Sequence, residues 1–150
     1  MLCNEYETVV VNKIFTMDMY ENRPLHLASQ EGHIEIVDVL LQKIQTSIPE
    51  EVSSVLTISH EKNDREESAL HLATIHGRLD VAQKLLEYEP NLYCCEDEDS
   101  NTPLHLACLN KKPKIAELLL KHGACITAMN CKKWTALDCA SFSGGLRCSF

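Results

Sequence analysis

Three histidines occupy the same position of a recurring motif, and imidazole is a side chain that binds metal ions and moves protons near neutral pH. They are His26, His71 and His105, and each lies in the pattern Leu-His-Leu-Ala. If each copy sits on a helix packed against the next, the rings are about 10 Å apart. One ion cannot bridge them, because zinc–nitrogen bonds are about 2 Å long. We therefore expect a structural role for these histidines and no metal site.

The chain contains eight cysteines, which are Cys3, Cys94, Cys95, Cys108, Cys125, Cys131, Cys139 and Cys148. Helical patterning already supplies a core and no secretory signal precedes it, so we expect reduced thiols rather than a disulfide scaffold. Four cysteines fall in adjacent predicted turns, but no Cys-x-x-Cys spacing occurs, and zinc is not predicted. The lysines at 132 and 133 favour a thiolate at Cys131. A reactive or redox-sensing role stays open for Cys94, Cys95 and Cys131.

The signatures of common enzyme classes are absent from the sequence. It contains no Gly-rich phosphate loop, no nucleophile elbow and no pair of carboxylates that would line a pocket. The acidic run at 96–99 is typical of a solvated turn. We therefore expect a protein that is not an enzyme, needs no cofactor and has no small-molecule substrate.

The net charge of −8 is distributed unevenly along the chain. Residues 1–99 carry 20 acidic and 7 basic side chains, whereas residues 100–150 carry 2 acidic and 7 basic ones. An acidic body disfavours nucleic acid, whose phosphates require cations. The first apolar patch is interrupted by Asn12 and Lys13, and no stretch approaches the ~20 apolar residues of a membrane span. We expect a cytoplasmic chain that binds no nucleic acid and makes no membrane contact of its own.

Four segments of the chain align with one another, with motif leucines at Leu25, Leu70, Leu104 and Leu137. The spacings between these leucines are 45, 34 and 33 residues. An Asp or Asn lies seven residues before each of them, and a leucine pair follows the first three at a constant distance. Seven residues after them lie Gly32, Gly77, Lys111 and Gly144. Agreement at so many positions indicates a true internal repeat.

Each repeat is predicted to form two helices. Asp or Asn opens a turn, and a hydroxyl residue such as Ser68 or Thr102 then caps a short first helix, which ends at a glycine. Second helices are predicted at 34–42, 79–87 and 114–121, where apolar residues fall on one helical face. A single hairpin cannot cover its apolar face, so stacking of neighbouring hairpins supplies the core.

The period, the turn Asp or Asn and the Pro-Leu-His-Leu-Ala motif resemble the ankyrin repeat. The resemblance covers about residues 16–145 and implies an all-α ankyrin-repeat solenoid of three full repeats plus a truncated fourth, with an elongated first repeat. Repeats are expected near 22–62, 67–98, 101–131 and 134–150, with an N-terminal extension at 1–15 and a tail at 146–150. The resemblance also implies that each motif histidine hydrogen-bonds the backbone of the neighbouring turn; Asp138 stands at that position in the fourth repeat.

The sequence departs from the ankyrin pattern in three places. The turn glycine four residues before each motif leucine is replaced by Glu21, Glu66, Ser100 and Lys133. We therefore expect turns that are strained or differently shaped. The first repeat has 11 or 12 extra residues, and segment 47–58 predicts a serine cap followed by an additional helical turn or two. The fourth repeat stops where its second helix should run, which predicts a piece of a longer array or an end covered by a partner.

Ankyrin arrays bind partners through turn tips and the exposed face of their first helices, so the resemblance implies a protein partner. The residues that we expect to contact it are Tyr20, Arg65, Ile75, Asp99, Leu109, Lys132, Trp134 and Phe142. Ile75, Leu109 and Phe142 share one offset in successive repeats and predict an apolar groove. Acidic tips flank this groove on one side and basic tips at its C-terminal end, where Trp134 is a favoured interface anchor. The alternative is that these side chains pack between neighbouring helices.

Two stretches, 100–108 and 134–140, resemble consecutive repeats of A-type transient receptor potential cation channels. This resemblance implies a fragment of the cytoplasmic ankyrin array of such a channel, whose membrane segments are absent from this chain. Turn cysteines of that family are linked to electrophile sensing, but no cysteine here matches such a site. Three alternatives follow: a free-standing interaction protein, a segment of a channel, and an ankyrin piece of a larger enzyme.

Overall fold

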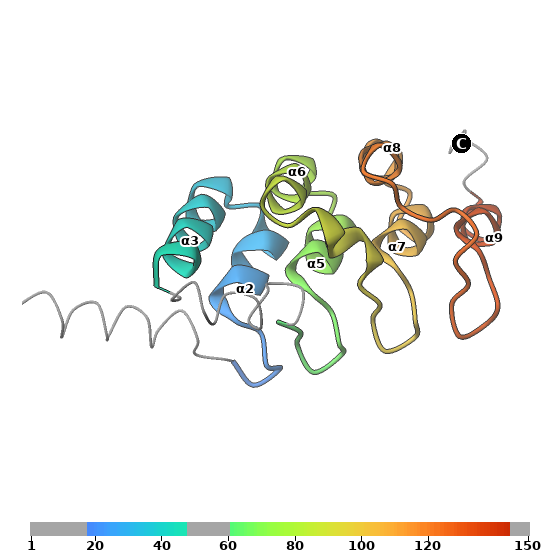
Figure 1. Ribbon diagram of the computed structural model, residues 1–150. Helices are drawn as coiled ribbons and strands as arrows, with labels where there is room; N and C mark the ends of the chain where they lie inside the picture. Colours follow the sequence, from blue (N-terminus) through green and yellow to red (C-terminus); the bar gives the residue numbers. More distant parts are fainter. Residues whose placement is uncertain (1–17, 48–60, 145–150) are drawn as a thin grey trace, which may run out of the picture.

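The computed structural model describes residues 18–47 and 61–144, which form a row of helical hairpins (Figure 1). Seven α-helices and one 3-10 helix occur in these residues, and no strand is found among them. The α-helices are α2 (Pro24–Glu31), α3 (Ile34–Ser47), α5 (Ala69–Ile75), α6 (Leu79–Tyr88), α7 (Pro103–Leu109), α8 (Pro113–Lys121) and α9 (Ala136–Phe142), and the 3-10 helix η2 (Pro90–Cys94) follows α6. The predicted all-α solenoid is confirmed.

The α-helices lie in two rows. The inner helices α2, α5, α7 and α9 pack against one another in chain order, and the outer helices α3, α6 and α8 pack along their side. Four turn tips project from the inner row in the same direction (Figure 1). They comprise residues 18–22, 63–67, 97–101 and 130–134. Because each hairpin packs against its neighbours, the core is built by stacking.

The core lies between the two rows and between successive repeats. The motif leucines Leu25, Leu70 and Leu104 are buried. The alanine three residues after each motif leucine is also buried, which lets the inner helices approach closely; these are Ala28, Ala73, Ala107 and Ala140. The four α6 residues predicted to share one face are at most 1% exposed: Val81, Ala82, Leu85 and Leu86.

Leu137, the fourth motif leucine, is 55% exposed and therefore differs from its three counterparts. In repeats 1 to 3 an outer helix follows the inner helix and packs against it. The described part of repeat 4 ends at Gly144, before the position of such a helix. α9 nevertheless begins after the N-cap residue Thr135, just as α7 begins after the N-cap residue Thr102. The exposure of Leu137 thus follows from its place in the array and not from a different local fold.

Helix α3 is longer than predicted, since it runs to Ser47 instead of ending at Gln42. No glycine or proline interrupts residues 42–47, and Ile44 packs against the core, so the helix has no reason to stop earlier. Ser47, predicted to cap an additional helix, is the last residue of α3. The rest of that predicted helix, the extension 1–15 and the tail 146–150 lie outside the described residues, and the repeat boundaries stay predictions.

The four turn tips share one conformation although none contains glycine. Glu21, Glu66, Ser100 and Lys133 have φ angles of 58°, 56°, 57° and 62°, in the left-handed region that costs a residue with a side chain about 1 kcal/mol. The Asp or Asn that begins each tip holds this shape. Its Oδ1 accepts the N–H groups two and four residues further on, at 2.8–3.0 Å. The tips are therefore strained, as expected, and alike.

Replacing Ser100 with glycine is expected to stabilise the protein by about 0.5–1 kcal/mol, because glycine adopts the left-handed conformation without steric conflict at Cβ. The measurement is the free energy of unfolding from urea denaturation. Ser141→Gly is the matched control: Ser141 is exposed and lies within α9, where glycine lowers helix stability. A loss of stability in the Ser100→Gly variant would show that the tip is not strained.

Candidate partner-binding surface

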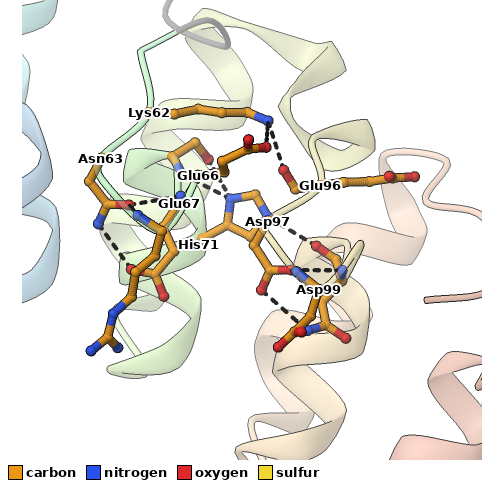
Figure 2. A network of polar contacts seen from close by, with 11 residues as sticks. Lys62, Asn63, Glu66, Glu67, His71, Glu96, Asp97 and Asp99 are labelled. Atoms are coloured by element: carbon orange, nitrogen blue, oxygen red, sulfur yellow. Dashed lines mark hydrogen bonds and ion pairs between the residues drawn. The ribbon is translucent and has the colours of Figure 1, made fainter. Parts of the chain in front are cut away.

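Each motif histidine connects two repeats. Its Nδ1 accepts the backbone N–H of the residue that precedes its own helix, at 3.0–3.2 Å. Its Nε2 donates to a carbonyl oxygen of the following segment, with distances of 3.1 Å from His26 to Glu61, 3.2 Å from His71 to Asn101 and 3.0 Å from His105 to Trp134. Figure 2 shows the ring of His71 within this network. The structural role implied by the resemblance is confirmed.

These hydrogen bonds fix each histidine as the neutral tautomer with its hydrogen on Nε2. A backbone N–H can only donate and a carbonyl oxygen can only accept, so the role of each ring nitrogen is determined. Burial lowers the pKa of His26, and it lowers the pKa of His71 from 6.5 to about 4. Across residues 18–47 and 61–144, no group of three or more His, Cys, Asp or Glu side chains could hold a metal ion.

Asp138 stands at the histidine position of repeat 4 and makes only the local part of this arrangement. Its Oδ2 accepts the N–H and the hydroxyl hydrogen of Thr135, both at 2.8 Å. These hydrogen bonds lower the pKa of Asp138. An ionised carboxylate has no hydrogen to donate to a carbonyl oxygen, and within the described part of the chain Asp138 bonds to no other repeat.

Neighbouring turn tips are joined by backbone hydrogen bonds. The N–H groups of Asp64, Glu98 and Cys131 donate to the carbonyl oxygens of Tyr20, Arg65 and Asp99, at 3.0–3.1 Å. At the first junction a side-chain amide adds a second bond, from Asn63 Nδ2 to Asn22 Oδ1. The third junction repeats it, from Asn130 Nδ2 to Asn101 Oδ1. The tips thus form one connected row.

The middle junction carries carboxylates at the positions where the other two carry amides. Glu67 and Asp97 occupy these positions, and two ionised carboxylates have no hydrogen to share. Lys62 crosses here instead: its Nζ donates to the carbonyl oxygen of Glu96 at 2.8 Å and lies 3.6 Å from Glu66 Oε2 (Figure 2). This exchange was not predicted from the sequence, although the last residue of each tip changes from Asn to Glu only in the second tip among the first three.

A hollow of about 320 Å³ opens between the first two turn tips and the inner helices α2 and α5. It brings together three of the predicted partner-binding residues, Tyr20, Arg65 and Ile75. Its other lining residues are Asn22, Gln30, Asn63, Asp64, Glu67, Leu72 and His76. Tyr20 and Arg65 are exposed and Ile75 is half-buried. A phenol, a guanidinium and an apolar wall therefore face the same space.

Three further predicted residues meet in repeat 4, and we call them the aromatic cluster: Lys132, Trp134 and Phe142. The rings of Trp134 and Phe142 have centroids 5.0 Å apart and planes inclined by 48°. Nζ of Lys132 lies 5.4 Å from the Trp134 ring centroid, within the range of cation–π attraction. Phe142 is 73% exposed, whereas Trp134 packs partly against the core.

The last two predicted residues are Asp99 and Leu109. Asp99 is exposed on the third turn tip, where the Sγ of Cys131 lies 3.8 Å from its Oδ1. Leu109 ends α7, half-buried against the core. The predicted apolar groove is therefore uneven: Leu109 packs partly against the core, Ile75 is half-buried beside the hollow, and Phe142 is open to solvent. Partner contact at all eight residues stays a prediction.

Comparison with known proteins assigns these repeats to a family. The family described as ankyrin repeats in three copies matches residues 48–130 and 90–148, and the family described as the ankyrin repeat matches residues 20–48. This chain belongs to the ankyrin-repeat family. Its ankyrin repeats therefore account for the helical hairpins and for the histidine at one position of the first three motifs.

Several curated proteins are similar to this ankyrin chain. It is 34% identical over 130 residues to the transient receptor potential cation channel subfamily A member 1 homolog of Caenorhabditis elegans. It is 35% identical over 123 residues to the transient receptor potential cation channel subfamily A member 1 of Homo sapiens. It is also 34% identical over 111 residues to ankyrin repeat protein nuc-2 of Neurospora crassa. The alignments cover 87%, 81% and 74% of this chain. The chain spans about a tenth of the length of these relatives (10%, 10% and 9%).

The ankyrin hairpins also distribute the cysteines between surface and core. The thiols of Cys94, Cys125 and Cys131 are exposed, whereas Cys108 and Cys139 are buried. A hydrogen bond with the Thr127 hydroxyl lowers the pKa of the Cys125 thiol.

In the described ranges, no helix is long and apolar enough to cross a membrane.

Proposed function

We propose that this ankyrin chain binds a protein partner through its turn tips and the concave face of its inner helices, and that it performs no catalysis. The exposed aromatic cluster is the observation that carries the proposal. A phenylalanine with most of its surface in water gains roughly 1.5–3 kcal/mol when it is covered. Tyr20 and Ile75 offer a second apolar site beside the guanidinium of Arg65. Ankyrin repeats act generally as protein-interaction modules, which agrees with this use of the surface.

A tip-face variant tests the proposal. It combines Tyr20→Ala, Arg65→Ala and Phe142→Ala. All three side chains are exposed, so their truncation leaves the core intact. The matched control combines Gln42→Ala and Glu87→Ala on the outer helices. Proteins retained from a cell extract by the immobilised chain are quantified by mass spectrometry. We consider the proteins that the wild type and the control retain in equal amounts. The amount of these proteins that the tip-face variant retains is expected to be about tenfold lower. Equal retention by all three chains would place binding elsewhere.

The second candidate function is that of a segment in the N-terminal cytoplasmic ankyrin array of an A-type transient receptor potential cation channel. Two observations favour it: 34–35% identity to two such proteins over more than four fifths of the chain, and coverage of only a tenth of their length. In that setting the chain lies on the cytosolic side of a membrane protein. Reading the flanking coding sequence tests this: further repeats and six apolar spans are expected. An open reading frame limited to 150 codons would contradict it.

A further inference from the structure

The charge of the turn tips changes sign between the third and the fourth tip. The first three tips, at 18–22, 63–67 and 97–101, carry eight carboxylates and one cationic side chain, Arg65. The fourth tip, at 130–134, carries no carboxylate and two lysines, Lys132 and Lys133. Both lysines are exposed, and neither forms an ion pair in the described part of the chain. Within residues 18–47 and 61–144, the cationic end of the row is therefore not neutralised by an ion pair.

The two charge regions are distinct on the scale over which charges act. Packed repeats are about 10 Å apart, and the Debye length at physiological ionic strength is about 8 Å. The electrostatic energy of a ligand charge that lies over one tip is therefore determined mainly by the charges of that tip. The boundary is rigidly placed, because the backbone N–H of Cys131 donates to the carbonyl oxygen of Asp99 at 3.0 Å. A ligand that crosses the boundary meets opposite potentials within one repeat.

An apolar anchor site coincides with the cationic end. Lys132 lies over the ring of Trp134, and Phe142 packs against that ring from α9 with most of its surface open. A partner residue placed here covers aromatic surface and lies beside the ammonium group of Lys132. Apolar contact beside an anionic group is thus favoured at repeat 4, and cationic groups are favoured at repeats 2 and 3.

We propose that the occupant of this surface is an extended peptide segment of a partner protein with segregated charges. Its basic residues lie against the second and third turn tips, and an acidic residue beside an apolar side chain lies against the aromatic cluster. An extended chain advances about 3.3 Å per residue, so a step of about 10 Å per repeat corresponds to about three residues. The basic positions and the acidic, apolar position therefore recur about three residues apart. This inference rests on the proposed function, since it describes the ligand of the same surface.

The test uses the 150-residue chain and a phage-displayed library of random peptides of about 12 residues, which is four repeats at about three residues each. Selected peptides are expected to carry bases in one half and an acidic residue next to an aromatic or aliphatic one in the other, about three residues apart. Selection is repeated on the variant Lys132→Glu/Lys133→Glu. There we expect the acidic preference to disappear while the basic half is kept. A synthetic peptide from the first selection should bind this variant about tenfold more weakly.

The matched control is Lys114→Glu/Lys121→Glu, which makes the same change in net charge on exposed positions of the outer helix α8. It should select the same peptides as the wild type, and circular dichroism confirms that both variants are folded. Peptides that bind the tip face without segregated charges would overturn this inference and leave the proposed function standing. Loss of binding on both charge variants alike would also overturn it, because net charge would then decide. If no selected peptide binds the tip-face variant more weakly than the wild type, both this inference and the proposed function are contradicted.

Discussion

The variant His71→Ala is expected to lose about 4 kcal/mol of unfolding free energy, which is a large fraction of the stability of a domain of this size. The ring is fully buried and hydrogen-bonds Ser68 in its own repeat and Asn101 in the next. Its removal leaves a cavity, the buried N–H of Ser68 without an acceptor, and the carbonyl oxygen of Asn101 with one donor, the N–H of Asp97, instead of two. Each of these defects costs free energy separately, and all three fall at the junction of repeats 2 and 3.

Urea denaturation followed by circular dichroism measures this loss, with the slope of the transition compared between variants. Asp138→Ala is the matched control, because Asp138 holds the same motif position but makes only local hydrogen bonds. The control should lose clearly less stability, and its transition should keep its slope. The His71→Ala transition should broaden, since the two halves of a repeat array uncouple when their interface is weakened. Equal losses in the two variants would mean that the bond between repeats contributes nothing.

Stability is expected to fall by about 3 kcal/mol as the pH is lowered from 6.5 to about 4, from His71 alone. Burial lowers the pKa of this imidazole to about 4 in the folded chain, against 6.5 when exposed. Above pH 6.5 neither state binds the proton, so the contribution is fully present. Between pH 6.5 and 4 only the unfolded state binds it, which favours unfolding. The pKa of His26 is lowered by burial too, so His26 acts in the same direction.

Comparison of the wild type with His71→Ala at pH 7 and at pH 4.5 isolates this effect. All other titrating groups are common to the two chains, so their contributions cancel in the difference. We expect the stability gap between them to narrow by about 2–3 kcal/mol at the lower pH. A gap that is the same at both pH values would show that proton binding at His71 does not distinguish the folded from the unfolded chain.

Most of the fold was predictable because the buried positions recur with the period of the repeat. Leu70 and Leu104 lie in equivalent surroundings, and the offsets between them identify the helices and the turns alike. The extension of α3 to Ser47 was not predictable from the period, because it falls where the first repeat departs from it. The left-handed tips were anticipated only as one of two alternatives. The sequence predicted that an Asp or Asn opens each turn, which is confirmed, but not that the left-handed residue would be kept without glycine.

The candidate site was predictable as a face of the molecule but not in its details. Offsets place Tyr20, Arg65 and Ile75 on that face, and the structure brings them around one hollow. The contact between Trp134 and Phe142 depends on side-chain rotamers of residues eight positions apart, which periodicity does not specify. Whether Leu109 is exposed depends on how closely α7 packs against its neighbours. A shared offset fixes the direction of a side chain and leaves its burial open.

The left-handed residues of the turn tips affect both the stability of the fold and the charges of the proposed partner-binding surface. Glycine at positions 21, 66 and 133 would relieve the backbone strain, as it would at Ser100. It would also remove three charged side chains, Glu21, Glu66 and Lys133, from the row of turn tips. An engineered version with four glycines would thus have a higher free energy of unfolding and a lower specificity for charged partners. Strained residues kept at a recognition surface are common where function and thermostability compete. In this solenoid the competition is confined to one residue in each turn.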